Sequence, residues 1–160
     1  MHARDLRWNR SSKYLMGLGV IVLLLFACVP LFSQSQKHGV AKALNEMKFV
    51  PDEDVKCLTT ELENGDPNKG PSTFILKAPS GCVVDWHYHT AEEQLIVIQG
   101  DVLTEMPDMP AKSLGPASFA MMPGKVPHRF TCNSKSGCIM YVTFDRTYDI
   151  FWGKNVSGAK

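Results

Sequence analysis

Several familiar features are missing from this chain of 160 residues. There is almost no charge excess, because 17 lysine and arginine side chains oppose 16 aspartates and glutamates. A nucleic-acid partner is therefore not expected, since binders of the phosphate backbone usually carry a clear basic excess. The sequence also has no Cys-x-x-Cys pair, Gly-x-Ser-x-Gly elbow, phosphate-binding loop or dinucleotide fingerprint. These absences argue against thioredoxin-like redox chemistry, serine hydrolysis and nucleotide-dependent catalysis.

The near-neutral charge is an average over two unlike parts. Apolar residues make up 44% of the chain and charged residues 21%, values that favour a folded protein over a disordered one. Within residues 1–35 four basic side chains face a single acid, Asp5. The remaining 125 residues hold 13 basic and 15 acidic side chains and are mildly acidic. The two parts therefore need separate interpretations.

Residues 1–35 are typical of an export segment. Basic residues up to Lys13 precede an apolar run at residues 14–32, a pattern whose positive end stays on the cytoplasmic side. The run suits a cleaved signal peptide ending before Gln36, or a retained helical membrane anchor. A third alternative is a lipoprotein, because the residues before Cys28 loosely resemble a lipoprotein box. All three place the rest of the chain outside the cytoplasmic membrane, in the periplasm or beyond.

The cysteines fit such a location. Beyond Cys28, the chain has Cys57, Cys82, Cys132 and Cys138. Four cysteines in an oxidising compartment allow two disulfides with three connectivities, and four free buried thiols are the alternative. Cys132 and Cys138 flank a short polar loop, so they could face each other across a hairpin. The sequence leaves the pairing open.

After a polar stretch at residues 36–64, the chain consists of short apolar segments separated by turn residues. Seven strands are predicted, with no convincing long helix, and this spacing indicates an all-β sandwich or barrel. The predicted strands are Ser72–Lys77, Cys82–His89, Gln94–Ile98, Asp101–Glu105, Ser118–Met122, His128–Cys132 and Ile139–Phe144.

The strand region contains a set of side chains suited to a metal. His87 and His89 stand one residue apart, so on a strand both imidazoles point to the same face. Glu93 follows across a short link, and His128 begins a later strand. Three imidazoles and a carboxylate suit Fe, Mn, Ni, Cu or Zn better than Ca or Mg. On an octahedral ion these four ligands would leave two positions open.

The same residues resemble the first conserved motif of the cupin superfamily. Gly81, His87, His89, Glu93 and Gly100 reproduce its spacing in full. The second motif is met in its Pro…His core by Pro123 and His128. The glycines that the family places in that motif fall at Ala117 and Lys125, with Gly115 and Gly124 close by.

The resemblance implies a double-stranded β-helix (jelly-roll) barrel at residues 65–153, similar to small single-domain bacterial cupins. Residues 36–64 would then be a linker or extension and residues 154–160 a tail. The metal, of unknown identity, would be held in the barrel mouth by His87, His89, Glu93 and His128. Such cupins are often homodimers, and membrane association would come only from an uncleaved N-terminal segment.

Strand alternation predicts the lining of the site. Phe130 should face inward with His128, and one of Met121 and Met122 should face the cavity. These three residues are the candidate substrate pocket. Asp85 could orient an imidazole or be a solvated carboxylate, and Lys125 could favour an anionic substrate or be an ordinary surface lysine.

Two functions fit these features. In the first, the chain is an exported metal-dependent enzyme, dioxygenase-like, acting on a small organic molecule, with Glu93 leaving the metal to act as a base. In the second, it is a binding or sensor module without turnover, similar to the cupin half of zinc-dependent anti-sigma factors. Fold alone does not separate them, because cupins host many activities.

Overall fold

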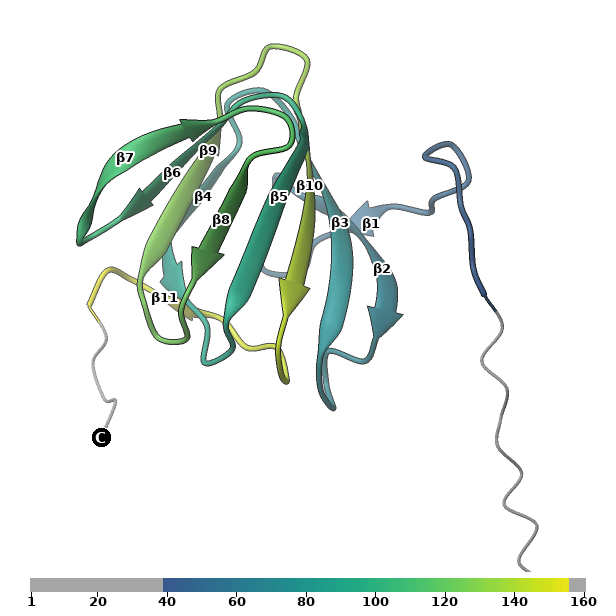
Figure 1. The fold of residues 1–160 in the computed structure, drawn as a ribbon, viewed down its shortest axis with the longest axis horizontal. Helices are drawn as coiled ribbons and strands as arrows, with labels where there is room; N and C mark the ends of the chain where they lie inside the picture. The colour runs from purple at the N-terminus through teal and green to yellow at the C-terminus, as the bar shows by residue number, and fades with distance from the viewer. Residues whose placement is uncertain (1–38, 156–160) are drawn as a thin grey trace, which may run out of the picture. The chain divides into compact units, whose positions relative to one another are not determined.

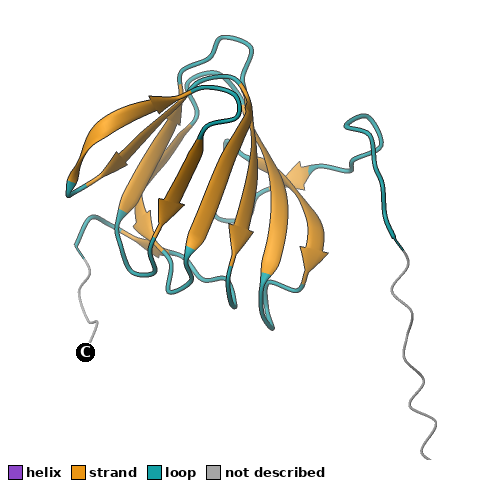
Figure 2. Cartoon of the chain, viewed as in Figure 1, coloured by secondary structure: helices purple, strands orange, loops and turns teal. Residues whose placement is uncertain are grey.

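The computed structural model describes residues 39–155. Within these residues no helix is long and apolar enough to cross a membrane. The helix, signal peptide or anchor predicted for residues 1–35 lies outside the described range. Figure 2 shows the described residues as strands joined by loops and turns, so the all-β prediction is confirmed for them.

Two antiparallel sheets make up the fold (Figure 1). The first has six strands in the order β1-β2-β3-β10-β5-β8, and the second has five in the order β11-β4-β9-β6-β7. Neighbours in each sheet are often distant in sequence. The strands are β1 (Val50–Pro51), β2 (Thr59–Gly65), β3 (Ser72–Ala78), β4 (Val83–Tyr88), β5 (Glu93–Gln99), β6 (Val102–Met106), β7 (Met109–Leu114), β8 (Phe119–Met122), β9 (His128–Cys132), β10 (Cys138–Phe144) and β11 (Phe151–Trp152).

Each of the seven predicted strands is present, with ends within one residue of the prediction. Four strands were not predicted, namely β1, β2, β7 and β11. β2 lies within residues 36–64, the stretch expected to be a linker or extension, and it pairs with β3 along its length. β7 contains Pro110 and is almost wholly exposed. These strands lack the apolar alternation that reveals a half-buried strand.

The core lies between the inward faces of the two sheets. Leu95 and Val97 on β5 meet Met140 and Val142 on β10, and all four are almost completely buried. Phe130 contributes from β9 of the other sheet. The burial alternates along each of these strands, as expected when one face is packed and the other is solvated.

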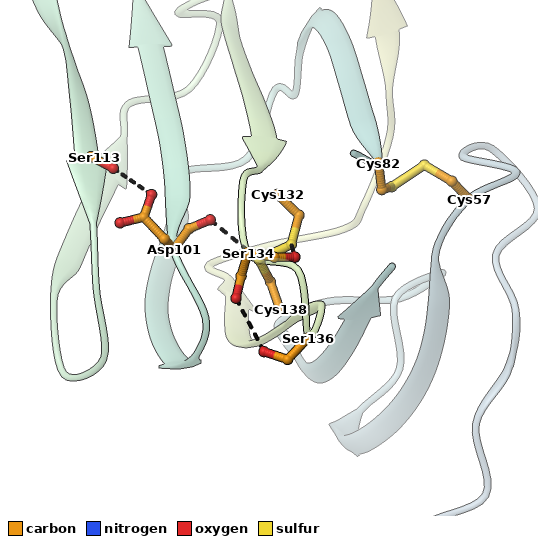
Figure 3. Close-up of a disulfide and its surroundings, with 8 residues drawn as sticks. All are labelled: Cys57, Cys82, Asp101, Ser113, Cys132, Ser134, Ser136 and Cys138. Atoms are coloured by element: carbon orange, nitrogen blue, oxygen red, sulfur yellow. Dashed lines mark hydrogen bonds between the residues drawn. A yellow bond between two sulfur atoms is a disulfide. The ribbon is translucent and has the colours of Figure 1, made fainter. Parts of the chain in front are cut away.

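Two disulfides lie at one end of the strands (Figure 3). Cys132 pairs with Cys138 across the six-residue separation that the sequence singled out. Cys57 pairs with Cys82 across 25 residues, so it links the chain before β2 to the start of β4. This resolves the pairing that the sequence left open. Four cysteines that meet in two pairs agree with an oxidising compartment.

Candidate metal centre

Four buried side chains from three regions converge inside the fold. His87 comes from β4, His89 from the residue after it, Glu93 from the start of β5 and His128 from the start of β9. One ligand atom from each lies within 4.8 Å of all the others. None of the four side chains is more than 3% exposed. The structure therefore brings together all four residues that the sequence nominated.

A bulge in β4 aims His87 at this point. Val84 pairs with Phe130 and His87 pairs with His128, so β4 has one residue more than β9 between these pairs. Such an extra residue interrupts the alternation and re-aims the side chains that follow. Val84 and His87 are consequently both buried, whereas residues three apart on a regular strand would face opposite sides of the sheet. Asp85 therefore points outward, with its side chain 75% exposed.

Three backbone carbonyls determine which ring nitrogen of each histidine carries a proton. Nδ1 of His87 donates to the carbonyl of Asp85 at 2.7 Å, and Nδ1 of His128 donates to that of Val126 at 2.9 Å. Nδ1 of His89 donates to the carbonyl of Asp149. A carbonyl can only accept, so each Nδ1 must carry the proton. In its neutral form each imidazole is then left with an Nε2 lone pair as a ligand atom, whereas His89 and His128 donate from Nε2 to Glu93 only when they are protonated.

The Asp149 contact was not predictable from residue type, since any residue supplies a carbonyl. The Asp149 side chain reinforces the position by accepting from the backbone N–H of Thr90 at 2.7 Å and from its hydroxyl at 2.5 Å. A segment 60 residues away thus holds the loop that carries His89. Asp85, one of whose predicted roles was to orient an imidazole, does so through its carbonyl rather than its carboxylate.

The carboxylate of Glu93 lies between two of the imidazoles. Its Oε2 is 3.0 Å from Nε2 of His128 and 3.2 Å from Nε2 of His89. Burial raises the pKa of a carboxyl group, but the hydrogen bonds from these imidazoles outweigh it and hold the pKa of Glu93 well below its usual range. Burial also opposes charge on His89, yet the hydrogen bond with Glu93 raises its pKa. Glu93 is therefore ionised.

His87 differs from the other two imidazoles. Burial lowers its pKa to about 4, with His128 contributing in the same direction. Its Nε2 has no hydrogen-bond partner among the described residues, because its only polar contact there is made through Nδ1. His87 is therefore neutral at physiological pH and presents an unused lone pair to the cluster.

This donor set fits a divalent transition metal. Three Nε2 lone pairs and an ionised carboxylate repel one another unless a cation lies among them. In the protein without a metal, only a proton can offset this repulsion. A bound divalent ion would replace the proton and satisfy all four groups. The nitrogen-rich set favours Fe, Mn, Ni, Cu or Zn.

A cavity of about 530 Å³ opens beside the cluster. His87, His89 and Glu93 line one part of it, and Phe130 contributes an apolar wall, as its predicted inward orientation requires. The volume is that of a site for a small organic molecule. Most of the remaining lining comes from β2, β3 and β10 and from two segments that the sequence did not nominate, residues 48–58 and residues 148–150.

The expectation for the two methionines needs correction. Met121 is 41% exposed and points away from the core, whereas Met122 is 1% exposed and pairs with Glu93 across the β5–β8 register. Neither is among the residues that line the cavity. Strand alternation sends only one of the two inward, and that one packs in the core. Lys125 is exposed and is also absent from the lining.

The comparisons with known proteins rest on structure. No family model matches the sequence, and no curated protein matches it either. Among solved structures, an RmlC-like cupin from Shewanella frigidimarina matches with a TM-score of 0.56 and 17% identity, over 69% of this chain and 93% of its own. The polyketide cyclase RemF from Streptomyces resistomycificus matches with a TM-score of 0.60 and 18% identity, over 77% and 89%.

An oxalate oxidase in complex with glycolate matches with a TM-score of 0.56 and 13% identity, over 74% of this chain and 66% of its own. Identities this low establish the fold and not the activity. They do agree with the topology of two antiparallel sheets. The described residues of this chain therefore have the cupin fold, and their His-His-Glu-His cluster fits a cupin metal site.

Proposed function

We propose that this chain is a metal-dependent enzyme, exported from the cytoplasm, that acts on a small organic molecule in an oxygenase-like reaction. The observation that carries the proposal is the convergence of three Nε2 lone pairs and the Glu93 carboxylate beside a cavity of about 530 Å³. A metal that only maintains the fold does not need a cavity large enough for a ligand next to it. The structural neighbours whose names state an activity, a polyketide cyclase and an oxalate oxidase, are enzymes.

His87, His89, Glu93 and His128 would hold the metal, which would supply Lewis-acid or redox chemistry to a bound molecule. The protein's own contribution is position and proton transfer. Phe130 and the apolar wall exclude water from the reacting groups. Glu93 is ionised and borders the cavity, so its carboxylate can leave the metal and accept a proton from the substrate.

The metal content of the purified full chain tests this proposal. The wild type should hold about one transition metal ion per chain, and Glu93→Gln should lose it because the amide removes the negative charge from a buried, nitrogen-rich site. Glu92→Gln is the matched control, since Glu92 contacts Gln94 rather than the imidazoles. Elemental analysis gives the content, and a chelator should lower the Tm of the wild type and of Glu92→Gln but not that of Glu93→Gln.

Turnover separates an enzyme from a binding module. Iron or manganese in the site together with oxygen uptake on a panel of diketones and phenols would support the proposed reaction class. A wild type that stays free of metal after reconstitution with Fe, Mn, Ni, Cu and Zn contradicts the metal site itself. Tightly held zinc with no turnover of any panel member would instead identify a sensor or ligand-binding module.

A further inference from the structure

Part of the cavity wall outside the metal cluster has a chemistry of its own. It is formed by residues 48–58, which precede β2, and by Tyr148 and Ile150, which follow β10. Among the charged residues of this segment that line the cavity, Asp52, Glu53 and Asp54 are acidic and only Lys48 is basic. The described cavity is therefore lined both by the metal cluster and by an acidic rim at residues 52–54.

Two cations lie beside this rim. Lys48 lines the cavity, and Nζ of Lys56 donates to the backbone carbonyl of Glu53 at 2.8 Å. Glu61 also borders the cavity, but its carboxylate binds Nζ of Lys42 at 2.6 Å. Arg146 is paired with Asp145 at 2.6 Å and does not line the cavity. The three carboxylates at residues 52–54 therefore outnumber Lys48 and Lys56, and an excess of negative charge remains beside the cavity.

Tyr148 connects the rim to the metal cluster. Its ring lies 5.3 Å from that of His89 and 5.0 Å from that of Phe144, measured between centroids. Its hydroxyl donates to Oδ2 of Asp54 at 3.3 Å. With its hydrogen committed to Asp54, the Tyr148 oxygen is left with lone pairs only. The rim thus offers hydrogen-bond acceptors and aromatic faces, the two features that bind an ammonium group.

The same cavity also contains a buried ligand atom without a partner. His87 is 2% exposed and lines the cavity, and its Nε2 has no hydrogen-bond partner among the described residues. A molecule filling the cavity would meet both the metal cluster and the acidic, aromatic rim.

We infer that the cavity selects a small molecule with an oxygen ligand at one end and an ammonium group at the other, and that Asp54 and Tyr148 determine this specificity. The inference rests on the proposed function for the metal-binding end and gives the substrate class. It argues against the alternative in which Lys125 attracts an anionic substrate. Lys125 does not line the cavity, and the rim that does is negatively charged. Attraction to the rim should weaken with salt, since Asp54 is exposed.

The first test uses an ammonium probe that needs no metal. Butylammonium chloride and sodium butyrate are titrated separately into the chelator-treated full chain, and the backbone amide signals of Asp54, Val55 and Tyr148 are followed by NMR. Butylammonium should give saturable shifts at these amides, and butyrate should give none. Asp54→Asn should weaken butylammonium binding about fivefold, while Asp108→Asn, which changes an exposed aspartate outside the cavity lining, should leave it unchanged.

The second test uses the metal-loaded protein. 4-Aminobutyrate should bind about tenfold more tightly than butyrate, and glutarate should bind more weakly than either, because only the distal group differs. Tyr148→Phe keeps the ring and removes the hydroxyl, so it should reduce the preference for 4-aminobutyrate while leaving the metal content and butyrate binding unchanged.

Failure of the inference and failure of the proposed function are distinguishable. If butyrate shifts the same amides as strongly as butylammonium, or if Asp54→Asn binds butylammonium as well as the wild type does, the inference is wrong whatever the metal content. If butylammonium binds as expected but no metal can be loaded, the proposed function is wrong and the ammonium-selective rim remains.

Discussion

Single residues decide the turns that hold the ligands. The two positions where the cupin pattern has glycine and this chain does not, Ala117 and Lys125, are the described non-glycine residues with positive φ, 65° and 67°. Both left-handed turns are thus formed without the residue that adopts them most easily. Lys125 also donates its backbone N–H to the carbonyl of His89 at 2.6 Å, so this turn directly supports a metal ligand.

Lys125→Gly should therefore stabilise the protein. A non-glycine residue in the left-handed region costs on the order of 1 kcal/mol, and glycine removes that cost at the expense of more freedom in the unfolded chain. We expect a net gain of about 0.5 kcal/mol in the free energy of unfolding, measured by urea titration. Lys125→Ala is the control, because it removes the charge and keeps the strain. An equal gain in both variants would attribute the effect to charge instead.

At the scale of elements, the cavity wall depends on a covalent link. Residues 52–58 contain little regular structure. The Cys57–Cys82 disulfide fixes one end of this segment. At the other end the Asp52 carboxylate accepts hydrogen bonds from the backbone N–H groups of Asp54 and Val55. The Cys132–Cys138 disulfide closes a short loop between β9 and β10, and neither of its cysteines lines the cavity.

The two disulfides should consequently differ in their contribution to stability. In the chain-entropy model, cross-linking residues 25 apart contributes roughly 3.5 kcal/mol and residues six apart roughly 2 kcal/mol. The variant Cys57→Ala with Cys82→Ala should therefore lose more unfolding free energy than Cys132→Ala with Cys138→Ala. Denaturant unfolding of the two double variants provides the comparison. Equal losses, or the reverse order, would show that local packing outweighs loop closure.

For the whole molecule, the disulfides and the N-terminal segment point to the same compartment. Two disulfides in a chain whose first 35 residues are typical of an export segment fit an oxidising environment. The location itself stays a prediction, as does the homodimer implied by the resemblance to cupins.

The reactivity of the cysteine thiols toward an alkylating reagent tests whether the chain is exported. In a bacterial host the full chain should be recovered outside the cytoplasm with Cys57, Cys82, Cys132 and Cys138 resistant to alkylation. Interrupting the apolar run with Leu23→Arg and Leu24→Arg should leave the protein inside the cell with reactive thiols, because charged residues at the centre of such a run oppose membrane insertion. Intact mass then distinguishes a cleaved signal from a retained anchor or a lipid on Cys28. Reactive thiols in the unmodified chain would contradict export.

The prediction of the fold succeeded where the burial pattern is regular. Strands such as β5 and β9 alternate buried and exposed residues, and in β9 the corresponding alternation of apolar and polar residues can be recognised in the sequence. β7 is a polar edge strand and β2 is a polar strand next to an edge; both are held by backbone hydrogen bonds to their neighbours, and their side chains carry no such signal. Their presence depends on which strand lies beside them.

The sequence by itself determined the ligands, because spacing along a strand places His87 and His89 on one face and chemistry selects Glu93 and His128 as their partners. Only the tertiary structure decided what surrounds them. The carbonyls of Asp85, Val126 and Asp149 that fix the three imidazoles are backbone groups without a residue signature. The acidic, aromatic rim joins residues 52–54 to Tyr148, 94 residues after Asp54. Contacts between such distant segments arise from the packing of the two sheets, which no local pattern encodes.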